Sequence, residues 1–185
     1  EEPLMVREQT QRFAVACLAA AVVVLADQGT KAAALGGLSQ EERIPLLGDL
    51  LGLQLAFNPG AILSLGAGVT GLLTLLGVGA VVLLVVAAAR ARTGWWALGI
   101  GLILGGAIGN LIDRLFSPPG FGVGHVTDFL AYGNLFIGNL ADVALGAGVI
   151  VLGLSLWTRP RRSRASADNA TTGAAPATGS AVSGS

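Results

Sequence analysis

The sequence predicts an α-helical integral membrane protein with four transmembrane helices and a small extracytoplasmic β-sheet between the first and second spans. Three observations lead to this fold class. Of the 185 residues, 53% are hydrophobic and only 12% are charged, a composition typical of membrane proteins. The apolar residues form four long runs, and the basic residues gather on one side of these runs.

Each of the four runs is long enough to cross a bilayer. A spanning helix needs about 20 mainly apolar residues, because the hydrocarbon core is about 30 Å thick. We place the spans at about 13–35, 69–89, 95–115 and 136–157, within one membrane domain over residues 13–157. This assignment puts Asp142 six residues inside the fourth span.

The arginines predict the orientation, because short loops rich in basic residues stay in the cytoplasm. Three groups fall on the same side of a four-span chain, namely Arg7 and Arg12, Arg90 and Arg92, and Arg159, Arg161, Arg162 and Arg164. Both termini are therefore expected in the cytoplasm, with residues 1–12 as a short N-terminal segment. Residues 158–185 start basic and then become rich in Ala, Ser, Thr and Gly, which predicts a disordered tail.

The sheet is predicted within the first outward segment, at about 38–66. Apolar residues alternate with other residues at Leu51, Leu53, Leu55 and Phe57, a period of two that is typical of a strand. The turn-forming run Asn58-Pro59-Gly60 ends this pattern. We expect a small sheet lying on the outer membrane surface.

Composition also excludes several classes of site. One cysteine and one histidine supply neither a disulfide framework nor a zinc site built from Cys and His. Eleven basic residues are balanced by eleven acidic residues, so no basic excess indicates a nucleic-acid partner. We expect no cofactor, no metal and no nucleic acid.

Ionisable residues mark the region where chemistry is expected, because each costs about 2.5–3.5 kcal/mol at the centre of a spanning helix. Asp27 and Lys31 are four residues apart, so they lie on one helix face and can pair. Such pairs alone also fit a structural role. On the predicted topology the polar side chains converge on the outer membrane face: Asp27, Lys31, Asn110, Asp113, Arg114, Asp128 and Asp142.

Asp128 and Asp142 differ from the other acids because neither has a cation at helical spacing in its own segment. Two neighbouring aspartates that share one proton supply a base to activate water and an acid to protonate a leaving nitrogen. This pattern favours peptide hydrolysis without a metal or a covalent nucleophile.

Five short motifs then resemble the bacterial lipoprotein signal peptidases, also called signal peptidase II. They occur in the family's order between about residues 12 and 157. They are Asp27-Gln28-Gly29-Thr30-Lys31, Asn58-Pro59-Gly60-Ala61, Gly105-Gly106-Ala107-Ile108-Gly109-Asn110-Leu111-Ile112-Asp113-Arg114, Val126-Thr127-Asp128-Phe129 and Asn139-Leu140-Ala141-Asp142.

The resemblance implies a multi-pass aspartyl endopeptidase of the bacterial cell (inner) membrane, with its active site near the extracytoplasmic face. It implies removal of the signal peptide from diacylglyceryl-modified prolipoproteins, on the amino side of the lipidated cysteine. The expected partners are these signal peptides and membrane lipid, and the chain is expected to be monomeric.

The same resemblance assigns roles to individual residues. Asp128 and Asp142 match the catalytic dyad. Asp27 and Lys31 match a structural or supporting pair, and Asp113 is expected to position Arg114. The residues expected to bind substrate or orient the dyad are Asn58, Gly60, Asn110, Arg114 and Asn139. Two departures concern the outer loops: residues 117–124 are longer than usual, while residues 130–138 are correspondingly short and Gly138 stands where the family usually has Phe.

Two alternatives remain at this stage. A Ser/Lys membrane peptidase would use Lys31, the only lysine, with a serine such as Ser64. A small proton- or ion-coupled transporter would use the aspartates as an ion pathway, but it requires polar groups along the full membrane depth. The peptidase is favoured because the ionisable residues gather at one face.

Overall fold

Four helices form the body of the protein in the computed structural model, which describes residues 2–60 and 67–158. They are α1 (Glu2–Gly37), α2 (Thr70–Ala89), α3 (Gly94–Phe116) and α4 (Leu140–Trp157), and each is long and apolar enough to cross a membrane. The four-span prediction is confirmed. The predicted disordered tail and the motif residue Ala61 lie outside the described residues, apart from Thr158 at the end of α4.

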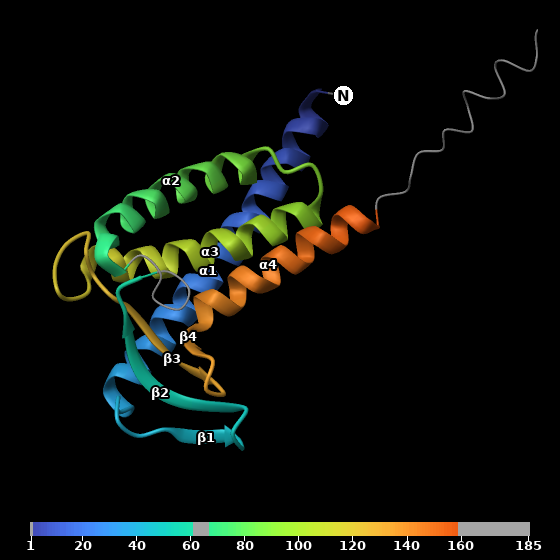
Figure 1. Ribbon diagram of the computed structural model, residues 1–185. Helices are drawn as coiled ribbons and strands as arrows, with labels where there is room; N and C mark the ends of the chain where they lie inside the picture. The colour runs from blue at the N-terminus through green and yellow to red at the C-terminus, as the bar shows by residue number, and fades with distance from the viewer. Residues whose placement is uncertain (1, 61–66, 159–185) are drawn as a thin grey trace, which may run out of the picture.

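A four-stranded antiparallel sheet packs at one end of the helices (Figure 1), and we call this end the sheet end. Its strands are β1 (Ile44–Leu47), β2 (Leu51–Asn58), β3 (Val126–Tyr132) and β4 (Phe136–Gly138), in that order across the sheet. A short 3-10 helix, η2 (Ala67–Val69), precedes α2. The sheet expected after the first span is therefore present, but half of its strands come from the segment between α3 and α4.

The start of α4 differs from the prediction. The fourth span was placed from residue 136, but residues Phe136–Gly138 form β4 and pair with β3. Asn139 then caps the helix: its side chain accepts a hydrogen bond from the Asp142 N–H, and the Asp142 carboxylate accepts one from the Asn139 N–H. This capping box begins the helix at Leu140, so Asp142 lies in its first turn rather than six residues inside.

The first helix is longer than predicted, because α1 starts at Glu2 and includes most of the segment expected to precede the span. Arg12 and Glu8 lie one turn apart in this extension and form an ion pair of 2.6 Å. An exposed pair at this spacing gives a helix modest support. Residues 1–12 are thus mainly the first turns of α1.

Small residues allow α3 to lie between α1 and α4 at very short distances. A Cβ atom at Gly105 would lie 2.6 Å from the Cβ of Val23 and 2.8 Å from the carbonyl oxygen of Ala20, both in α1. A Cβ at Gly106 would lie 2.5 Å from the carbonyl oxygen of Ala141 in α4. Glycine is needed at such close backbone approaches, and here it lets the middle of α3 pack against the middle of α1 and the start of α4.

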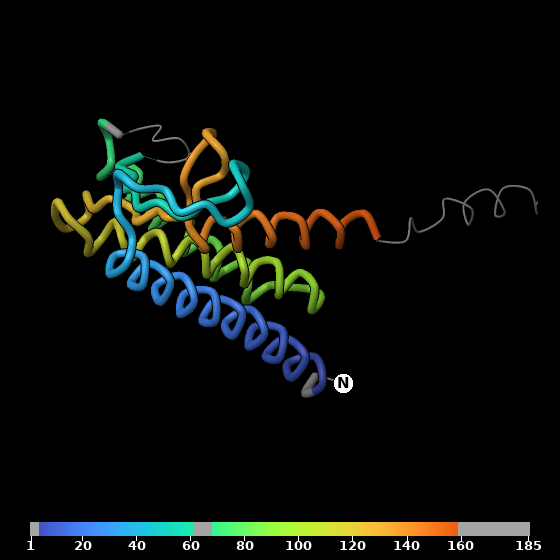
Figure 2. Tube along the Cα trace, turned by 90° about the horizontal axis from the view of Figure 1, so that it is seen from below, coloured from blue at the N-terminus to red at the C-terminus, as the bar shows by residue number. Residues whose placement is uncertain are grey.

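The described chain ends lie away from the sheet. Figure 1 shows the start of α1, the end of α4 and the α2–α3 connection at the opposite end of the helices. In Figure 2, seen from below, α1 and α4 likewise extend away from the strands. This arrangement fits a chain that crosses a membrane four times and carries its sheet on one side.

Candidate active site

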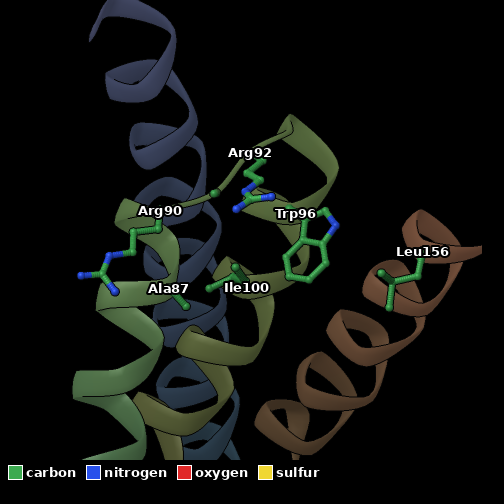
Figure 3. Close-up of a pocket in the computed structure, with 7 residues that line it drawn as sticks. Ala87, Arg90, Arg92, Trp96, Ile100 and Leu156 are labelled. Carbon is green, nitrogen blue, oxygen red and sulfur yellow. The ribbon is translucent and has the colours of Figure 1, made fainter. Parts of the chain in front are cut away.

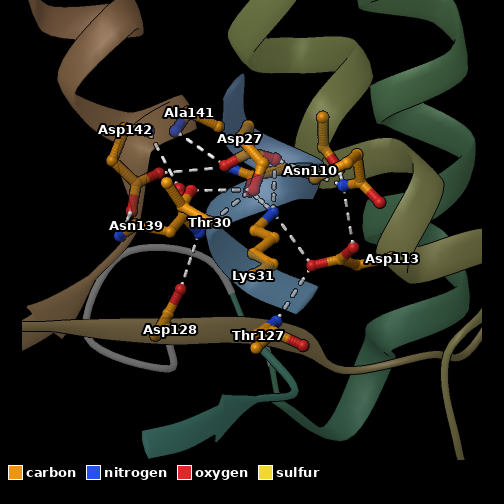
Figure 4. A network of polar contacts seen from close by, with 12 residues as sticks. Asp27, Thr30, Lys31, Asn110, Asp113, Thr127, Asp128, Asn139, Ala141 and Asp142 are labelled. Carbon is orange, nitrogen blue, oxygen red and sulfur yellow. Dashed lines mark hydrogen bonds and ion pairs between the residues drawn. The ribbon is translucent and has the colours of Figure 1, made fainter. Parts of the chain in front are cut away.

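Buried polar side chains gather where the sheet meets the helices (Figure 4), and they come from α1, α3, β3 and the start of α4. Most interior residues of the described chain are small or apolar, so this group is an exception. Its buried members are Asp27, Lys31, Asp113, Thr127, Asp128 and Asn139. Buried polar groups of this kind must satisfy one another with hydrogen bonds and ion pairs.

Asn139 contacts both aspartates of the predicted dyad. Its side-chain nitrogen Nδ2 donates to Asp128 Oδ1 at 2.7 Å, and its backbone N–H donates to Asp142 Oδ2 at 3.1 Å. Asn110 closes the arrangement, because its Nδ2 donates to Asp142 Oδ1 at 3.0 Å while its Oδ1 accepts from Asn139 Nδ2 at 3.0 Å. Asn139 therefore links the two carboxylates, one from a strand and one from a helix start, and Asn110 joins Asp142 to Asn139.

The surroundings of the two aspartates differ. Asp128 is only 2% exposed, whereas Asp142 is exposed. Burial, followed by the negative charge of Asp142, raises the pKa of Asp128 to about 7, against the opposing effect of hydrogen bonds from Asn139 and Asn58 and of the Lys31 charge. A buried carboxyl next to a second carboxylate tends to keep its proton near neutral pH, which suits a pair that shares one proton.

Lys31 forms ion pairs with two acids at once. Its Nζ lies 2.8 Å from Asp27 Oδ2 and 2.9 Å from Asp113 Oδ2, and it donates to Asn110 Oδ1 at 3.1 Å. Figure 4 shows the ammonium pointing between the two acids. The predicted pairing of Asp27 with Lys31 is present, and Asp113 from α3 joins it.

Each of these acids also holds the backbone next to a dyad residue. Asp27 Oδ1 accepts a hydrogen bond from the Ala141 N–H at 2.9 Å, and Ala141 precedes Asp142. Asp113 Oδ2 accepts one from the Thr127 N–H at 3.0 Å, and Thr127 precedes Asp128. The chain segments that bear the two dyad residues are thus anchored to a common ammonium group.

The contacts of Asp113 extend beyond the expected role. It was expected to position Arg114, and its charge does act on the Arg114 guanidinium. Its hydrogen bonds and ion pair, however, join the carboxylate to Lys31, Gln28 and the Thr127 N–H. Gln28 received no role from the sequence, yet its Nε2 donates to Asp27 Oδ2, to Asp113 Oδ1 and to the Gly109 carbonyl at 3.1–3.2 Å. Its position between Asp27 and Lys31 in the first motif was the available signal.

Arg114 instead fixes the turn that follows β2. Its guanidinium donates to the carbonyl oxygen of Pro59 at 3.4 Å and to that of Gly60. The Gly60 N–H in turn donates to Asn58 Oδ1 at 2.9 Å. Asn58, Gly60 and Arg114 therefore form one unit, which places the Asn58 side chain beside Asp128.

The geometry does not favour the Ser/Lys alternative. A lysine base needs an amine that is free to take a proton from the serine, but the Lys31 Nζ is held in ion pairs by Asp27 and Asp113. Ser39 donates to Glu41 Oε2 at 2.6 Å, and Ser64 lies outside the described residues. Within residues 2–60 and 67–158, no group of three or more His, Cys, Asp or Glu side chains is arranged to hold a metal ion.

Comparisons with known proteins agree on one family. Residues 19–158 match the family model described as Signal peptidase (SPase) II. The lipoprotein signal peptidase of Rhodococcus jostii is 43% identical over 142 residues, which cover 77% of this chain and 72% of that protein. The lipoprotein signal peptidase of Leifsonia xyli subsp. xyli is 44% identical over 155 residues, which cover 83% and 70%.

Solved structures show the same fold. A bacterial membrane enzyme determined by the in meso method at 2.3 Å resolution superposes with a TM-score of 0.69 at 23% sequence identity. The match covers 80% of this chain and 94% of that one. A second such structure, at 1.9 Å resolution, gives a TM-score of 0.65. The arrangement of four helices and a small sheet is therefore shared.

Proposed function

The chain belongs to the signal peptidase II family, and from that premise we propose that it is an aspartyl endopeptidase in which Asp128 and Asp142 hydrolyse the peptide bond. The family removes signal peptides from prolipoproteins. The observation that supports the dyad most directly is that Asn139 contacts both carboxylates, while burial and the Asp142 charge raise the pKa of Asp128 to about 7.

The mechanism requires one proton shared by the pair. The ionised aspartate takes a proton from a water molecule, whose oxygen attacks the scissile carbonyl carbon. The protonated aspartate gives its proton to the departing amide nitrogen. Two coupled carboxyls titrate as a unit, so the proton belongs to the pair, and burial together with the Asp142 charge raises the pKa of Asp128 to about 7.

The surrounding polar residues orient this chemistry. Asn110 and Asn139 fix the Asp142 carboxylate through both of its oxygens, which leaves its remaining lone pairs for water. Arg114 holds the turn at Pro59 and Gly60, and this turn presents Asn58 toward the site. These residues bind substrate carbonyls or orient the dyad carboxylates. Asp27 and Asp113, paired with Lys31, hold the backbone beside the two aspartates.

The substrate suits a site at the membrane surface. A prolipoprotein signal peptide is an apolar segment with a diacylglyceryl-modified cysteine beside the scissile bond, so it enters laterally from lipid. Water reaches the exposed Asp142 at the sheet end. We place this end on the extracytoplasmic side of the bacterial cell membrane and both termini in the cytoplasm, following the arginine distribution, with one chain as the working unit.

A cleavage assay tests this assignment. The purified protein is incubated with a diacylglyceryl-modified prolipoprotein, and Asp128→Asn and Asp142→Asn are measured separately. Each is expected to lower the cleavage rate by a factor on the order of 10² to 10⁴, the range for loss of general acid–base catalysis. Asp49→Asn is the matched control, because Asp49 is exposed in the β1–β2 turn. Near-normal cleavage by either dyad variant would contradict the shared-proton mechanism.

A further inference from the structure

A hollow of about 360 Å³ lies at the end of the helices opposite the sheet, far along α3 from the aspartates. Arg90 and Arg92 of the α2–α3 connection line it, together with Trp96 and Ile100 of α3 and Leu156 of α4. Figure 3 shows Arg92 and Trp96 on the side of the hollow formed by the start of α3, across from Leu156. The hollow therefore combines two cations, an aromatic ring and an apolar wall.

The two arginines are the unusual feature of this hollow. Both are exposed, and within the described chain neither guanidinium makes a hydrogen bond or an ion pair. Three other arginines are engaged: Arg12 pairs with Glu8, Arg43 donates to the carbonyls of Gly133 and Asp49, and Arg114 donates to those of Pro59 and Gly60. Arg7 is exposed on α1 and does not line the hollow. Each free guanidinium offers five donors, so the mouth of the hollow suits an anion.

The rest of the hollow suits an apolar chain. Ile100 is only 4% exposed, whereas Leu156 is 52% exposed and faces outward from the end of α4. Trp95, which precedes Trp96 at the start of α3, is 67% exposed, and tryptophan at the end of a spanning helix is typical of the headgroup level of a bilayer. A ligand that fills both parts has a negative head and a hydrocarbon tail.

We propose that this hollow is a binding site for an anionic phospholipid. Arg90 and Arg92 hold the headgroup phosphate, since the guanidinium fork matches phosphate oxygens, and an acyl chain lies against Ile100 and Leu156. Basic hollows between spanning helices are suited to such headgroups. The chain's own continuation is a poor occupant, because residues 159–164 contain four arginines and would be repelled.

Lipid retention measured by native mass spectrometry tests the proposal. The full chain is purified in a neutral detergent and titrated with dioleoyl phosphatidylglycerol or dioleoyl phosphatidylcholine, which share acyl chains and differ in charge. The wild type is expected to retain the anionic lipid more strongly. The Arg90→Gln/Arg92→Gln variant should lose roughly fivefold in affinity for each arginine, the scale of one basic side chain near an anionic surface.

Arg7→Gln is the matched control. Arg7 is also exposed and lies at the same end of the helices, but it does not line the hollow, so its loss should leave retention unchanged. Equal retention of both lipids by the wild type would overturn the proposal, as would an equal loss in Arg7→Gln or no loss in the double variant. Binding of glycerol 1-phosphate with similar affinity would show a simple anion site and would also overturn it.

Two further measurements keep the result interpretable. The single variants Arg90→Gln and Arg92→Gln repeat the test with smaller changes if the double variant does not fold. Bound lipid is counted directly, so the outcome does not depend on peptide cleavage. If Asp128 and Asp142 proved not to be catalytic, the lipid result would still stand or fall on its own.

Discussion

The ammonium group of Lys31 offers the sharpest test of how the site is built. It forms ion pairs with Asp27 and Asp113, and these acids accept hydrogen bonds from the backbone N–H groups of Ala141 and Thr127. Those two residues directly precede the dyad aspartates in the sequence. Replacing Lys31 by methionine, which has a similar length and no charge, should therefore disturb both dyad residues although it removes neither.

The expected magnitude follows from burial. The side chains of Lys31, Asp27 and Asp113 are 3%, 0% and 6% exposed. Removing one partner from a buried ion pair costs about 3–5 kcal/mol, a large part of the roughly 5–15 kcal/mol that stabilises a typical folded domain. A shift of about 1 Å in a reacting group costs on the order of 10²-fold in rate, so we expect losses in both stability and turnover.

The assay separates these two losses. Thermal unfolding is followed for Lys31→Met, and kcat for cleavage of a diacylglyceryl-modified prolipoprotein is measured well below its unfolding temperature. Arg12→Met is the control on the same helix. Its ion pair with Glu8 has the same spacing but is solvent-exposed, so its loss should cost less than about 1 kcal/mol and leave kcat unchanged.

Two outcomes would refute this reasoning. If Lys31→Met unfolded at the wild-type temperature, the buried ammonium would not stabilise its acidic partners as the contacts indicate. If it lost stability but, while folded, cleaved with wild-type kcat, then Asp27 and Asp113 would not position the dyad.

Three other predictions follow from the same structure. Because the pKa of Asp128 is raised to about 7, its proton is present below that pH and lost above it, so kcat should fall roughly tenfold between pH 6 and pH 8; an unchanged rate would exclude Asp128 as the proton donor. A Cβ at Gly105 would lie 2.6 Å from the Cβ of Val23 in α1, so Gly105→Ala should lower the free energy of unfolding by about 1–3 kcal/mol, measured by thermal unfolding. Gly79→Ala in α2 is the control, because nothing lies within 4 Å of its added Cβ, and it should not destabilise the protein. Ser39→Ala, Ser64→Ala and Ser117→Ala should each retain wild-type cleavage, and loss of cleavage in any of them would revive a serine mechanism.

The spans were predictable because their signal is local. Uninterrupted apolar runs of about 20 residues identify membrane helices without knowledge of the partners. The pairing of Asp27 with Lys31 was likewise predictable, since both lie one turn apart on one helix. The convergence of polar residues at one end followed from the span order alone.

The partners of Asp113 and of β3 were not predictable in the same way. Asp113 lies 82 residues from Lys31 in the sequence. Whether the two side chains form an ion pair depends on how α3 packs against α1. Strand β2 pairs with β3 so that Ala56 lies opposite Asp128. The residue pattern of one strand does not indicate which other strand it pairs with. Non-local contacts of this kind depend on the assembled fold.

The start of α4 is a different case, because a local signal was present. Asn139 and Asp142 have the spacing of a capping box, but the apolar residues before them extended the apparent span. Where an apolar run contains an N-cap residue, the helix is better started after that residue. Started after Asn139, the fourth helix has Asp142 in its first turn.

The Lys31–Asp27 pair also bears on how the chain enters its membrane during synthesis. Both charges belong to α1, so this first helix brings a neutral pair with it before any later helix has been made. Asp113, in contrast, meets the ammonium only when α3 packs against α1. Closure of the polar cluster is therefore coupled to completion of the helical assembly, and a truncated chain that ends before α3 would carry the first pair without the second acid.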